Sequence, residues 1–396
     1  MPLKLYAYAS LGDFILLYPV YTLLFSDSGL TVPEITSLLV IWAVTGLLLE
    51  VPSGALADAL SRKALLVAAP LLGAAGFALW TAVPAYWAFA AGFVLWGARE
   101  ALESGALEAL VYDHLDHDGA AEEYAKVMGR ARAIGLVAVA LSMAVASPVF
   151  AWGGYAVAGV ASVLACLACA AVALTFTERR AAAPDDDSAG YLDTLRAGLA
   201  EARTSPKVRH ALLLVPAVTA IWGELEEYVP LLAREGGATT QAVPLLVLLV
   251  WVGATSGGLL AKYGGRLRAR GFAAILAVGG LALGLGAITG HPAGFAGIAL
   301  AFAMFQLGGV LADARLQERI TGPSRATVTS LAGLATDVCT IVALVMYGAA
   351  SLVLPHSVLF ALFSVPYLVI ALVMSKSARP LRPRGGSTPD HEGLIT

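Results

Sequence analysis

Ionisable side chains lie within long apolar stretches of this chain, where their chemistry suits the uptake of protons or the binding of a small charged molecule. They are Asp13, Glu50, Arg99, Glu100, Glu103, Glu224, Glu226, Glu227 and Asp337. Ionising a carboxylate among apolar groups costs free energy, so such a group can exchange a proton near neutral pH. Eight carboxylates against one guanidinium make the set acidic, which favours a cationic or neutral lipophilic ligand.

The stretch LWGAREALESGALEALVYDHL, residues 95–115, carries the densest group of these charges. On a helix, Arg99, Glu100 and Glu103 fall within an arc of about 100°, and we expect them to face one central cavity. Arg99 and Glu103 are four residues apart and can pair. This leaves Glu100 without an obvious partner and makes it a candidate proton carrier. The alternative is a structural Arg99–Glu103 pair, with Glu100 hydrogen-bonded elsewhere.

Two other segments add carboxylates. WGELEEYVP places Glu224, Glu226 and Glu227 in the outer half of a predicted helix, and we expect at least one of them to face the cavity. The alternative is that this end of the helix is simply hydrated. Asp13, in SLGDFILLYPVY, and Asp337 are the remaining candidates for proton coupling.

Aromatic and amide side chains in the same apolar stretches are candidates for lining a substrate pocket. They are Tyr18, Tyr21, Trp42, Trp96, Tyr112, Trp222, Tyr228, Trp251 and Gln306. The alternative for each Trp and Tyr is an anchor at the membrane surface or a packing role.

The elements that carry these residues are predicted to be membrane-spanning helices. The chain is 59% hydrophobic and 13% charged, whereas soluble domains are about 25% charged. Windows of about 20 apolar residues predict an all-α membrane protein with twelve helices. Their ranges are 5–26, 34–57, 63–82, 85–112, 127–150, 153–175, 209–232, 240–261, 270–290, 293–314, 326–350 and 355–376.

The distribution of basic residues predicts the orientation. Apart from Arg99 and Arg234, all Lys and Arg residues lie in alternate loops or in the two tails. The positive-inside rule therefore places both termini in the cytoplasm. The longest connection divides the chain into two six-helix halves. The predicted parts are an N-terminal half (1–176), a cytoplasmic linker with a surface helix at about 190–203 (177–208), a C-terminal half (209–376) and a disordered tail (377–396).

The connection after the second predicted helix carries a recognisable pattern. GALADALSRK resembles the loop signature Gly-x-Leu-Ala-Asp-Arg-x-Gly-Arg-Lys of the major facilitator superfamily. Ala59 and Ser61 depart from it. The resemblance extends to the twelve helices and the division into halves. EVPSGALAD, SGALEALVYD and RATVTSL further resemble a bacterial branch of presumed exporters.

This resemblance implies the superfamily fold, a multi-pass protein of the inner (plasma) membrane, and a first helix that lines the cavity. It also implies a cytoplasmic latch between the halves. The candidate gate residues are Glu50, Gly54, Asp58, Arg62, Lys63, Glu108, Asp113, Arg130 and Arg325. The alternative is that Arg62 and Lys63 are a plain positive-inside anchor beside a solvated Asp58. For Glu108 and Asp113, the candidate partners are Arg130, Arg132 and Arg325.

Motifs of other function classes are missing from the sequence. It contains no HExxH, GxxxxGK[ST], GxSxG or Cys/His cluster, so we expect no enzyme, no cofactor and no metal site. Cys166 and Cys169 form a C-x-x-C inside an apolar helix, which we interpret as packing. A net charge of −3 argues against a nucleic-acid partner. We expect a monomer in the lipid bilayer.

These observations predict a secondary active transporter that works by alternating access and exports a small organic compound in exchange for protons. An importer or facilitator of a metabolite is the alternative, and a non-transporting membrane sensor or enzyme is a third. Arg99 lies six residues before Gly105, unlike the Arg-x-x-Gln-Gly spacing of drug antiporters in the superfamily. This departure weakens an assignment to drug antiport.

Overall fold

The computed structural model describes residues 1–178, 206–264, 267–320 and 325–377, without the side chains of 50–59, 206–207, 325–327 and 377. Within these ranges the chain is helical and has no strand. The predicted linker helix at 190–203 and the predicted tail beyond 377 lie outside the described residues. The side chains of Glu50, Asp58 and Arg325, three of the predicted gate residues, lie outside them as well, as does any contact of Gly54.

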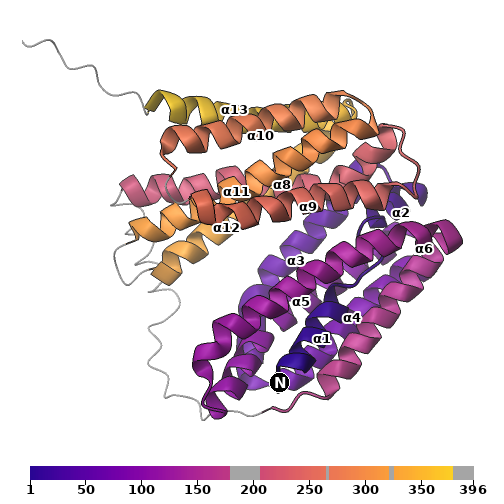
Figure 1. The fold of residues 1–396 in the computed structure, drawn as a ribbon. Coiled ribbons are helices and arrows are strands. Elements are labelled where there is room, and N and C mark those ends of the chain that lie inside the picture. The colour runs from indigo at the N-terminus through magenta and orange to yellow at the C-terminus, as the bar shows by residue number, and fades with distance from the viewer. Residues whose placement is uncertain (179–205, 265–266, 321–324, 378–396) are drawn as a thin grey trace, which may run out of the picture.

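The helices form two groups, and each group contains a similar set of helices (Figure 1). The N half contains α1 (Pro2–Asp13), α2 (Tyr21–Asp27), α3 (Val32–Ala59), α4 (Arg62–Ala82), α5 (Tyr86–His117), a 3-10 turn (Ala121–Glu123) and α6 (Tyr124–Leu174). The C half contains α8 (Pro206–Glu235), α9 (Val243–Gly264), α10 (Ala269–Ile288), a 3-10 turn (Pro292–Gly294), α11 (Phe295–Arg319), α12 (Arg325–Ala350) and α13 (His356–Ser377).

The same pairing of helices occurs in both halves. In the N half, α5 packs on α3 and α4, while α6 packs on α1 and α4. In the C half, α11 packs on α9 and α10, α13 packs on α10, and α12 packs on α8. Glycines allow the closest of these approaches. At Gly257 of α9, an added Cβ would clash with the backbone carbonyl of Ala303 in α11, as in small-residue packing of membrane helices.

The first predicted helix, 5–26, is wrong as a continuous helix. Residues 14–20 are not helical and separate α1 from α2. Pro19 explains the break, because proline donates no backbone hydrogen bond and disfavours helical geometry at the residue before it. The Ser162 hydroxyl accepts a hydrogen bond from the Leu17 backbone N–H at 3.1 Å, which compensates for part of the lost helix.

The fifth and sixth predicted helices lie in one element, α6, which changes direction at Gly154. This residue has φ 59° and ψ −151°, a conformation that glycine adopts without strain. The turn at Gly154 therefore separates two helical segments close to the predicted ends at 150 and 153.

Nine helices within the described ranges are long and apolar enough to cross a membrane. In this count α6 is one helix, and α1 and α2 are each too short. The apolar run of α5 is not among the nine; it contains Arg99, Glu100 and Glu103. The chain is therefore a multi-pass membrane protein, whereas twelve spans and cytoplasmic termini stay predictions.

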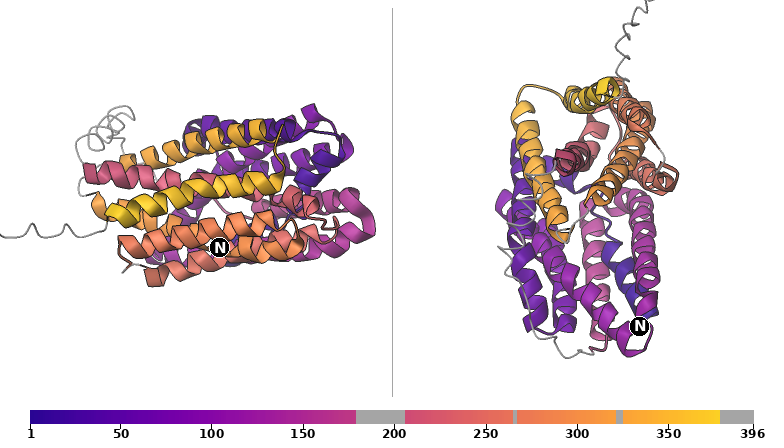
Figure 2. Two further views of the ribbon diagram at one scale, coloured as in Figure 1. Left: turned by 90° about the horizontal axis from the view of Figure 1, so that it is seen from above. Right: turned by 90° about the vertical axis from the view of Figure 1, so that its left-hand side faces the viewer.

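The two halves meet at one end of the molecule and diverge towards the other (Figure 1). We call the diverging end the basic end, because Lys4, Lys63, Arg130, Lys262 and Arg319 lie there at or near helix termini. The opposite end, with Asp27 and Arg234, is the far end. In the right-hand view of Figure 2 the C half lies above the N half.

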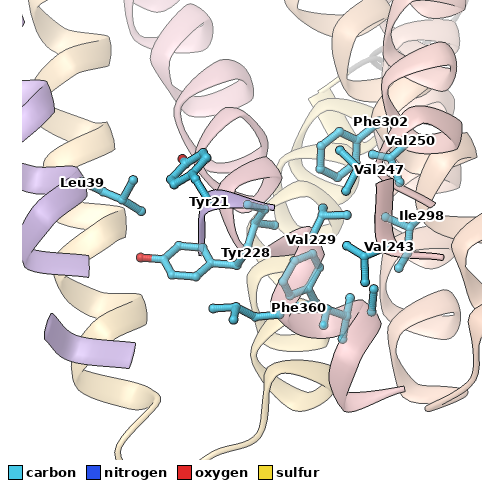
Figure 3. Packing of buried hydrophobic residues seen from close by; sticks show 14 of the residues in the cluster. Tyr21, Leu39, Tyr228, Val229, Val243, Val247, Val250, Ile298, Phe302 and Phe360 are labelled. Atoms are coloured by element: carbon cyan, nitrogen blue, oxygen red, sulfur yellow. The ribbon is translucent and has the colours of Figure 1, made fainter. Parts of the chain in front are cut away.

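One buried hydrophobic cluster extends through both halves near the far end. Figure 3 shows Tyr21 and Leu39 of the N half facing Tyr228 of α8. Tyr228 is fully buried and stacks on Tyr347 with ring centroids 3.9 Å apart. Its hydroxyl lies 2.7 Å from the Thr36 hydroxyl of α3. The far end is thus closed by apolar packing as well as by polar contacts.

Candidate functional site

A cavity of about 290 Å³ lies between the two halves and is lined by side chains from both. Its carboxylates are Asp13, Glu100, Glu226 and Glu227, and its aromatic side chains are Tyr18, Tyr21, Trp42, Phe93, Trp96 and Trp251. Among the described residues that line it, none is Lys, Arg or His. The cavity therefore combines an excess of negative charge with aromatic faces.

The break between α1 and α2 places three side chains at this cavity. Asp13 ends α1, Tyr18 lies in the non-helical segment, and Tyr21 begins α2. The Tyr18 ring stacks on Trp96 with centroids 5.1 Å apart. The Tyr21 hydroxyl donates a hydrogen bond to Glu227 of α8. Tyr21 thus joins the cavity walls of the two halves.

Glu100 lines the cavity and has two hydrogen-bond donors that the sequence did not reveal. The indole N–H of Trp96 donates to Oε1 at 2.8 Å, and that of Trp42 donates to Oε2 at 3.0 Å. The side chain is nevertheless exposed to the cavity. The expectation that Glu100 lacks a partner was wrong, because it considered only Arg99 and not the indoles of Trp96, four residues earlier on the same helix, and Trp42 of α3.

Arg99 lies inside the N half and not on the cavity wall. It is 5% exposed, and its Nη2 donates to the Gly12 carbonyl of α1 at 2.8 Å. Its Nε lies 3.7 Å from Glu103 Oε2, which is the predicted pairing. A Cβ at Gly73 would lie 3.0 Å from Arg99 Cδ, so α4 leaves room for the side chain. The three charges of α5 therefore do not share one cavity-facing arc, because Arg99 points into the helix packing.

Asp13 occupies space that a glycine of α6 leaves free. An added Cβ at Gly135 would clash with Asp13 Oδ2. The carboxylate therefore lies against the α6 backbone while it borders the cavity. Any larger residue at position 135 would displace it.

The three glutamates of α8 point in two directions. Glu226 and Glu227 line the cavity, whereas Glu224 borders a narrow crevice with Ala343 and Tyr347 of α12. Asp337 of α12 is partly buried and is not among the residues that line the cavity.

Four of the predicted pocket residues are elsewhere. Tyr112 is exposed on α5 and packs edge-on against Tyr124 with centroids 5.8 Å apart. Tyr228 packs between the halves, the Trp222 ring packs edge-on against Phe302 with centroids 5.6 Å apart, and Gln306 contacts Gly258 of α9. Tyr18, Tyr21, Trp42, Trp96 and Trp251 do line the cavity.

At the basic end, the described gate residues make contacts within the N half. Arg62 forms an ion pair with Asp113 of α5, a pairing that the sequence interpretation did not consider. Glu108 lies 3.2 Å from Arg132, one of its predicted partners. Lys63 follows Arg62 at the start of α4, and Arg130 is exposed on α6. A latch between the halves stays a prediction.

Glu178 was not recognised from the sequence. Its Oε1 accepts a hydrogen bond from the Arg62 backbone N–H at 2.9 Å, and Oε2 accepts one from the Ser61 hydroxyl. A carboxylate at the start of a helix is favoured by the helix dipole. In the sequence, the position of Glu178 just after an apolar helix was the feature that could have indicated this role.

At the far end, an ion pair joins the halves. Arg234 Nη1 lies 2.5 Å from Asp27 Oδ1, and the Tyr155 hydroxyl donates to Asp27 Oδ2 at 2.5 Å. Burial disfavours the ionised carboxylate, but the hydrogen bonds from Arg234 and Tyr155 outweigh it and lower the pKa of Asp27. Arg234 is the only basic residue in the predicted outer loops, and this was the signal for the pair.

Comparison with known proteins gives a consistent result. A sequence model of the Major Facilitator Superfamily matches residues 5–344. No curated protein matches the chain. A variant of the nucleoside transporter NupG has a TM-score of 0.75 at 13% identity, with 96% of this chain and 100% of that chain covered.

Two other solved structures are similar. An auto-inhibited peptide transporter of the POT family has a TM-score of 0.67 at 16% identity, with 98% of each chain covered. A D-xylose–proton symporter has a TM-score of 0.62 at 16% identity, with 95% and 96% covered. The family match and these neighbours identify a transporter and not an enzyme, and the chain belongs to the Major Facilitator Superfamily.

Proposed function

We propose that this transporter exports small organic cations in exchange for protons. The observation that carries the proposal is the composition of the central cavity, in which four carboxylates and six aromatic side chains meet without a basic side chain among the described lining residues. Carboxylates compensate a positive charge, and the faces of aromatic rings attract it. A small number of polar groups in an otherwise apolar pocket is typical of a ligand site.

Proton coupling follows from competition for the same carboxylates. A proton on Glu100, Glu226 or Glu227 removes the negative charge that would hold a cation. Proton entry from outside would therefore displace a cation that was bound from the cytoplasm. Because Tyr21 bonds Glu227 across the two halves, protonation there also acts on the contact between the halves.

Importers and exporters both pass through an arrangement open at the cytoplasmic end, so the direction is drawn from the resemblance of EVPSGALAD, SGALEALVYD and RATVTSL to a branch of presumed exporters. The positive-inside rule assigns the basic end to the cytoplasm, and the halves diverge at this end (Figure 1). A far end closed by Asp27 and Arg234 corresponds to a conformation that loads substrate from the cytoplasm. Alternating access would open the far end after the basic end closes. We place the transporter, as a monomer, in the plasma (inner) membrane of a bacterium.

Transport in inverted membrane vesicles tests this proposal. With an imposed proton gradient, acid inside, we expect accumulation of tetraphenylphosphonium and loss of the label when the gradient is collapsed. Glu100→Gln and Glu226→Gln should reduce accumulation about tenfold or more, the loss expected for one buried charge interaction. Glu122→Gln, on an exposed turn outside the cavity, is the matched control.

The possible outcomes separate the candidate functions. Accumulation with the opposite gradient would identify an importer, and flux that follows only the substrate gradient would identify a facilitator. If organic anions but not organic cations raised the thermal stability of the purified protein, the cationic substrate class would be wrong.

A further inference from the structure

The carboxylates that line the central cavity differ in the hydrogen bonds that they accept. Both oxygens of Glu100 accept an indole N–H, at 2.8 Å from Trp96 and at 3.0 Å from Trp42. Glu227 accepts a tyrosine hydroxyl. Glu226 lines the same cavity, but within the described part of the chain no group donates a hydrogen bond to its carboxylate. The cavity carboxylates are therefore not equivalent.

The surroundings of Glu100 suit a bound cation. A hydrogen-bond donor stabilises the ionised form of a carboxylate, so the two indoles hold Glu100 as an anion. Trp42 and Trp96 line the cavity with their ring centroids 5.8 Å apart, and the Tyr18 ring stacks on Trp96. Aromatic faces attract cations, and donation to an anion polarises an indole so that its face becomes more negative. The anion and the aromatic faces together form a site for the charged group of a ligand.

The surroundings of Glu226 suit a group that gains and loses a proton. Protonation of Glu226 breaks no hydrogen bond or ion pair with the described residues. By contrast, protonation of Glu100 weakens its bonds from two indoles, and protonation of Glu227 weakens its bond from Tyr21. Of these three carboxylates, Glu226 therefore changes its charge with the least effect on the contacts around it.

The ionisable groups near Glu226 are acidic or uncharged. They are Glu224 and Glu227 of α8, Asp337 of α12 and, around the cavity, Asp13, Glu100, Tyr18 and Tyr21. Of the other helices packed on α8, α9 faces the cavity with Val247 and Trp251, and α11 and α13 face it with no described residue. A further negative charge among acidic groups is unfavourable unless a cation is bound. The charge of Glu226 is thus linked to the presence of a cation.

Asp13 also accepts no hydrogen bond from the described residues, but it occupies a different place. It ends α1 and lies against the α6 backbone at Gly135, within the N half. Glu226 instead precedes Glu227 and Tyr228, two of the α8 side chains that bond to the N half. A proton on Glu226 therefore lies beside contacts that must open before the far end can admit it.

We propose that Glu100 binds the charged group of the substrate and that Glu226 carries the coupling proton. This inference rests on the proposed function and assigns its two steps to different carboxylates. A proton from the far end forms an O–H bond on Glu226, which leaves one negative charge fewer to hold a cation at Glu100. The proton is released at the basic end when the next cation binds. Trp42 and Trp96 are positioning residues, because they hold the Glu100 carboxylate in its ionised form.

Binding of tetraphenylphosphonium to the purified full-length protein, measured as a function of pH, tests the assignment. In the native protein we expect the affinity to fall as the pH falls. Glu226→Gln imitates the protonated acid, so it should have the acid-pH affinity of the native protein at every pH. Glu100→Gln should lower the affinity about tenfold at every pH but keep its pH dependence.

Conservative variants are the matched controls. Glu226→Asp keeps a carboxylate and should keep the pH dependence. Trp42→Phe keeps an aromatic face but removes the N–H that donates to Oε2. Its affinity should fall more steeply in acid, because Glu100 then also takes up protons. Glu122→Gln, on an exposed turn, should bind as the native protein does.

The outcomes separate this inference from the proposed function. If the native protein binds no organic cation at any pH, the proposed function is wrong, and this inference falls with it. If it binds cations but Glu226→Gln keeps the pH dependence, or Glu100→Gln or Asp13→Asn loses it, the assignment of the proton to Glu226 is overturned while the substrate class stands. If Glu226→Gln did not fold, the pH dependence of Glu100→Gln and Asp13→Asn would still decide the assignment.

Discussion

The two halves share a pattern of helix packing but treat their charges differently. In the N half, Arg99 lies between Glu103 and the Gly12 carbonyl, and Arg62 pairs with Asp113. In the C half, Glu226 and Glu227 line the cavity without a basic side chain beside them on its wall. Both halves thus place two carboxylates on the cavity wall, but the N half also holds arginines that are paired within its own helix packing.

This difference indicates that paired and unpaired charges have separate roles in transport. The Arg62–Asp113 and Arg99–Glu103 pairs are not on the cavity wall, so their charges stay compensated whether or not substrate is bound. Carboxylates that lack such partners respond to a proton or a cation, as those of α8 do. Asp13 and Glu100 extend this response to the N half, but only at the cavity surface.

The largest effect is expected at Arg99. Arg99→Ala leaves Glu103 partly buried without its cation, and breaking a buried pair in this way costs about 3–5 kcal/mol. Thermal unfolding in detergent measures the loss. By contrast, Glu226→Gln in the C half should be neutral or stabilising, because it removes a carboxylate with no paired cation on the cavity wall.

A double variant checks the cause. Arg99→Ala combined with Glu103→Gln should recover a large part of the stability, since both charges are then absent. If the double variant is as unstable as Arg99→Ala, packing of the long side chain against Gly73, and not charge compensation, explains its role.

The next effect concerns glycines that allow close helix contact. At Gly257 an added methyl group meets the backbone of α11, which cannot move without separating two helices, so Gly257→Ala should cost about 1–3 kcal/mol. Gly135→Ala in the N half meets the Asp13 carboxylate, a side chain that can rotate away. It should cost less stability but reduce proton-coupled transport.

Two other glycines of the same helices, Gly258 of α9 and Gly129 of α6, provide controls for this prediction. Gly258 has its nearest non-local atom at 3.6 Å, an ordinary contact, and Gly129 has no atom within 4 Å. Gly258→Ala and Gly129→Ala should therefore be neutral or stabilising by up to about 1 kcal/mol, the difference in helix propensity. Equal losses at Gly257 and Gly258 would contradict the packing argument.

Much of the fold followed from the sequence because helix length and hydropathy are local properties. The all-helical class and the turn near residue 154 were predictable in this way. The break at residues 14–20 was missed although Pro19 lies within it. Its compensation by Ser162 was not predictable, because Ser162 lies on a helix far along the chain.

The site was predictable only in part for the same reason. Counting along one helix gave the Arg99–Glu103 pair and the acidic character of α8. The Trp96–Glu100 contact, four residues apart on α5, was available to the same counting but was missed. The Trp42–Glu100 contact and the Arg62–Asp113 pair were not available, because they join side chains 58 and 51 residues apart on different helices. Which face of α5 points inward depends on α1 and α4.

A smaller effect is expected at the far-end ion pair, which depends on pH. Because the pKa of Asp27 is lowered, the ion pair contributes its full stabilisation at pH values above the ordinary pKa of aspartate. This stabilisation is lost as the pH falls through the lowered pKa. Closure of the far end should thus persist at neutral pH and weaken in acid. Asp27→Asn should remove this dependence.

Labelling of a cavity cysteine measures far-end opening. In a Cys339→Ser background, Val247→Cys places a thiol on the cavity wall, and an impermeant maleimide is added from the far end. We expect Asp27→Asn to raise the labelling rate at neutral pH by at most about fivefold, as for a partly exposed pair. An unchanged rate at every pH would show that apolar packing around Tyr228 alone closes this end.

The smallest effect separates two ion pairs of the N half. Glu108 and Arg132 are 52% and 74% exposed, whereas Asp113 and Arg62 are each 16% exposed. Glu108→Gln should therefore change the free energy of unfolding by less than about 0.5 kcal/mol. Asp113→Asn should cost more, because it leaves the Arg62 guanidinium partly buried beside a neutral amide. Equal effects at both positions would mean that the Arg62–Asp113 pair is as hydrated as the Glu108–Arg132 pair.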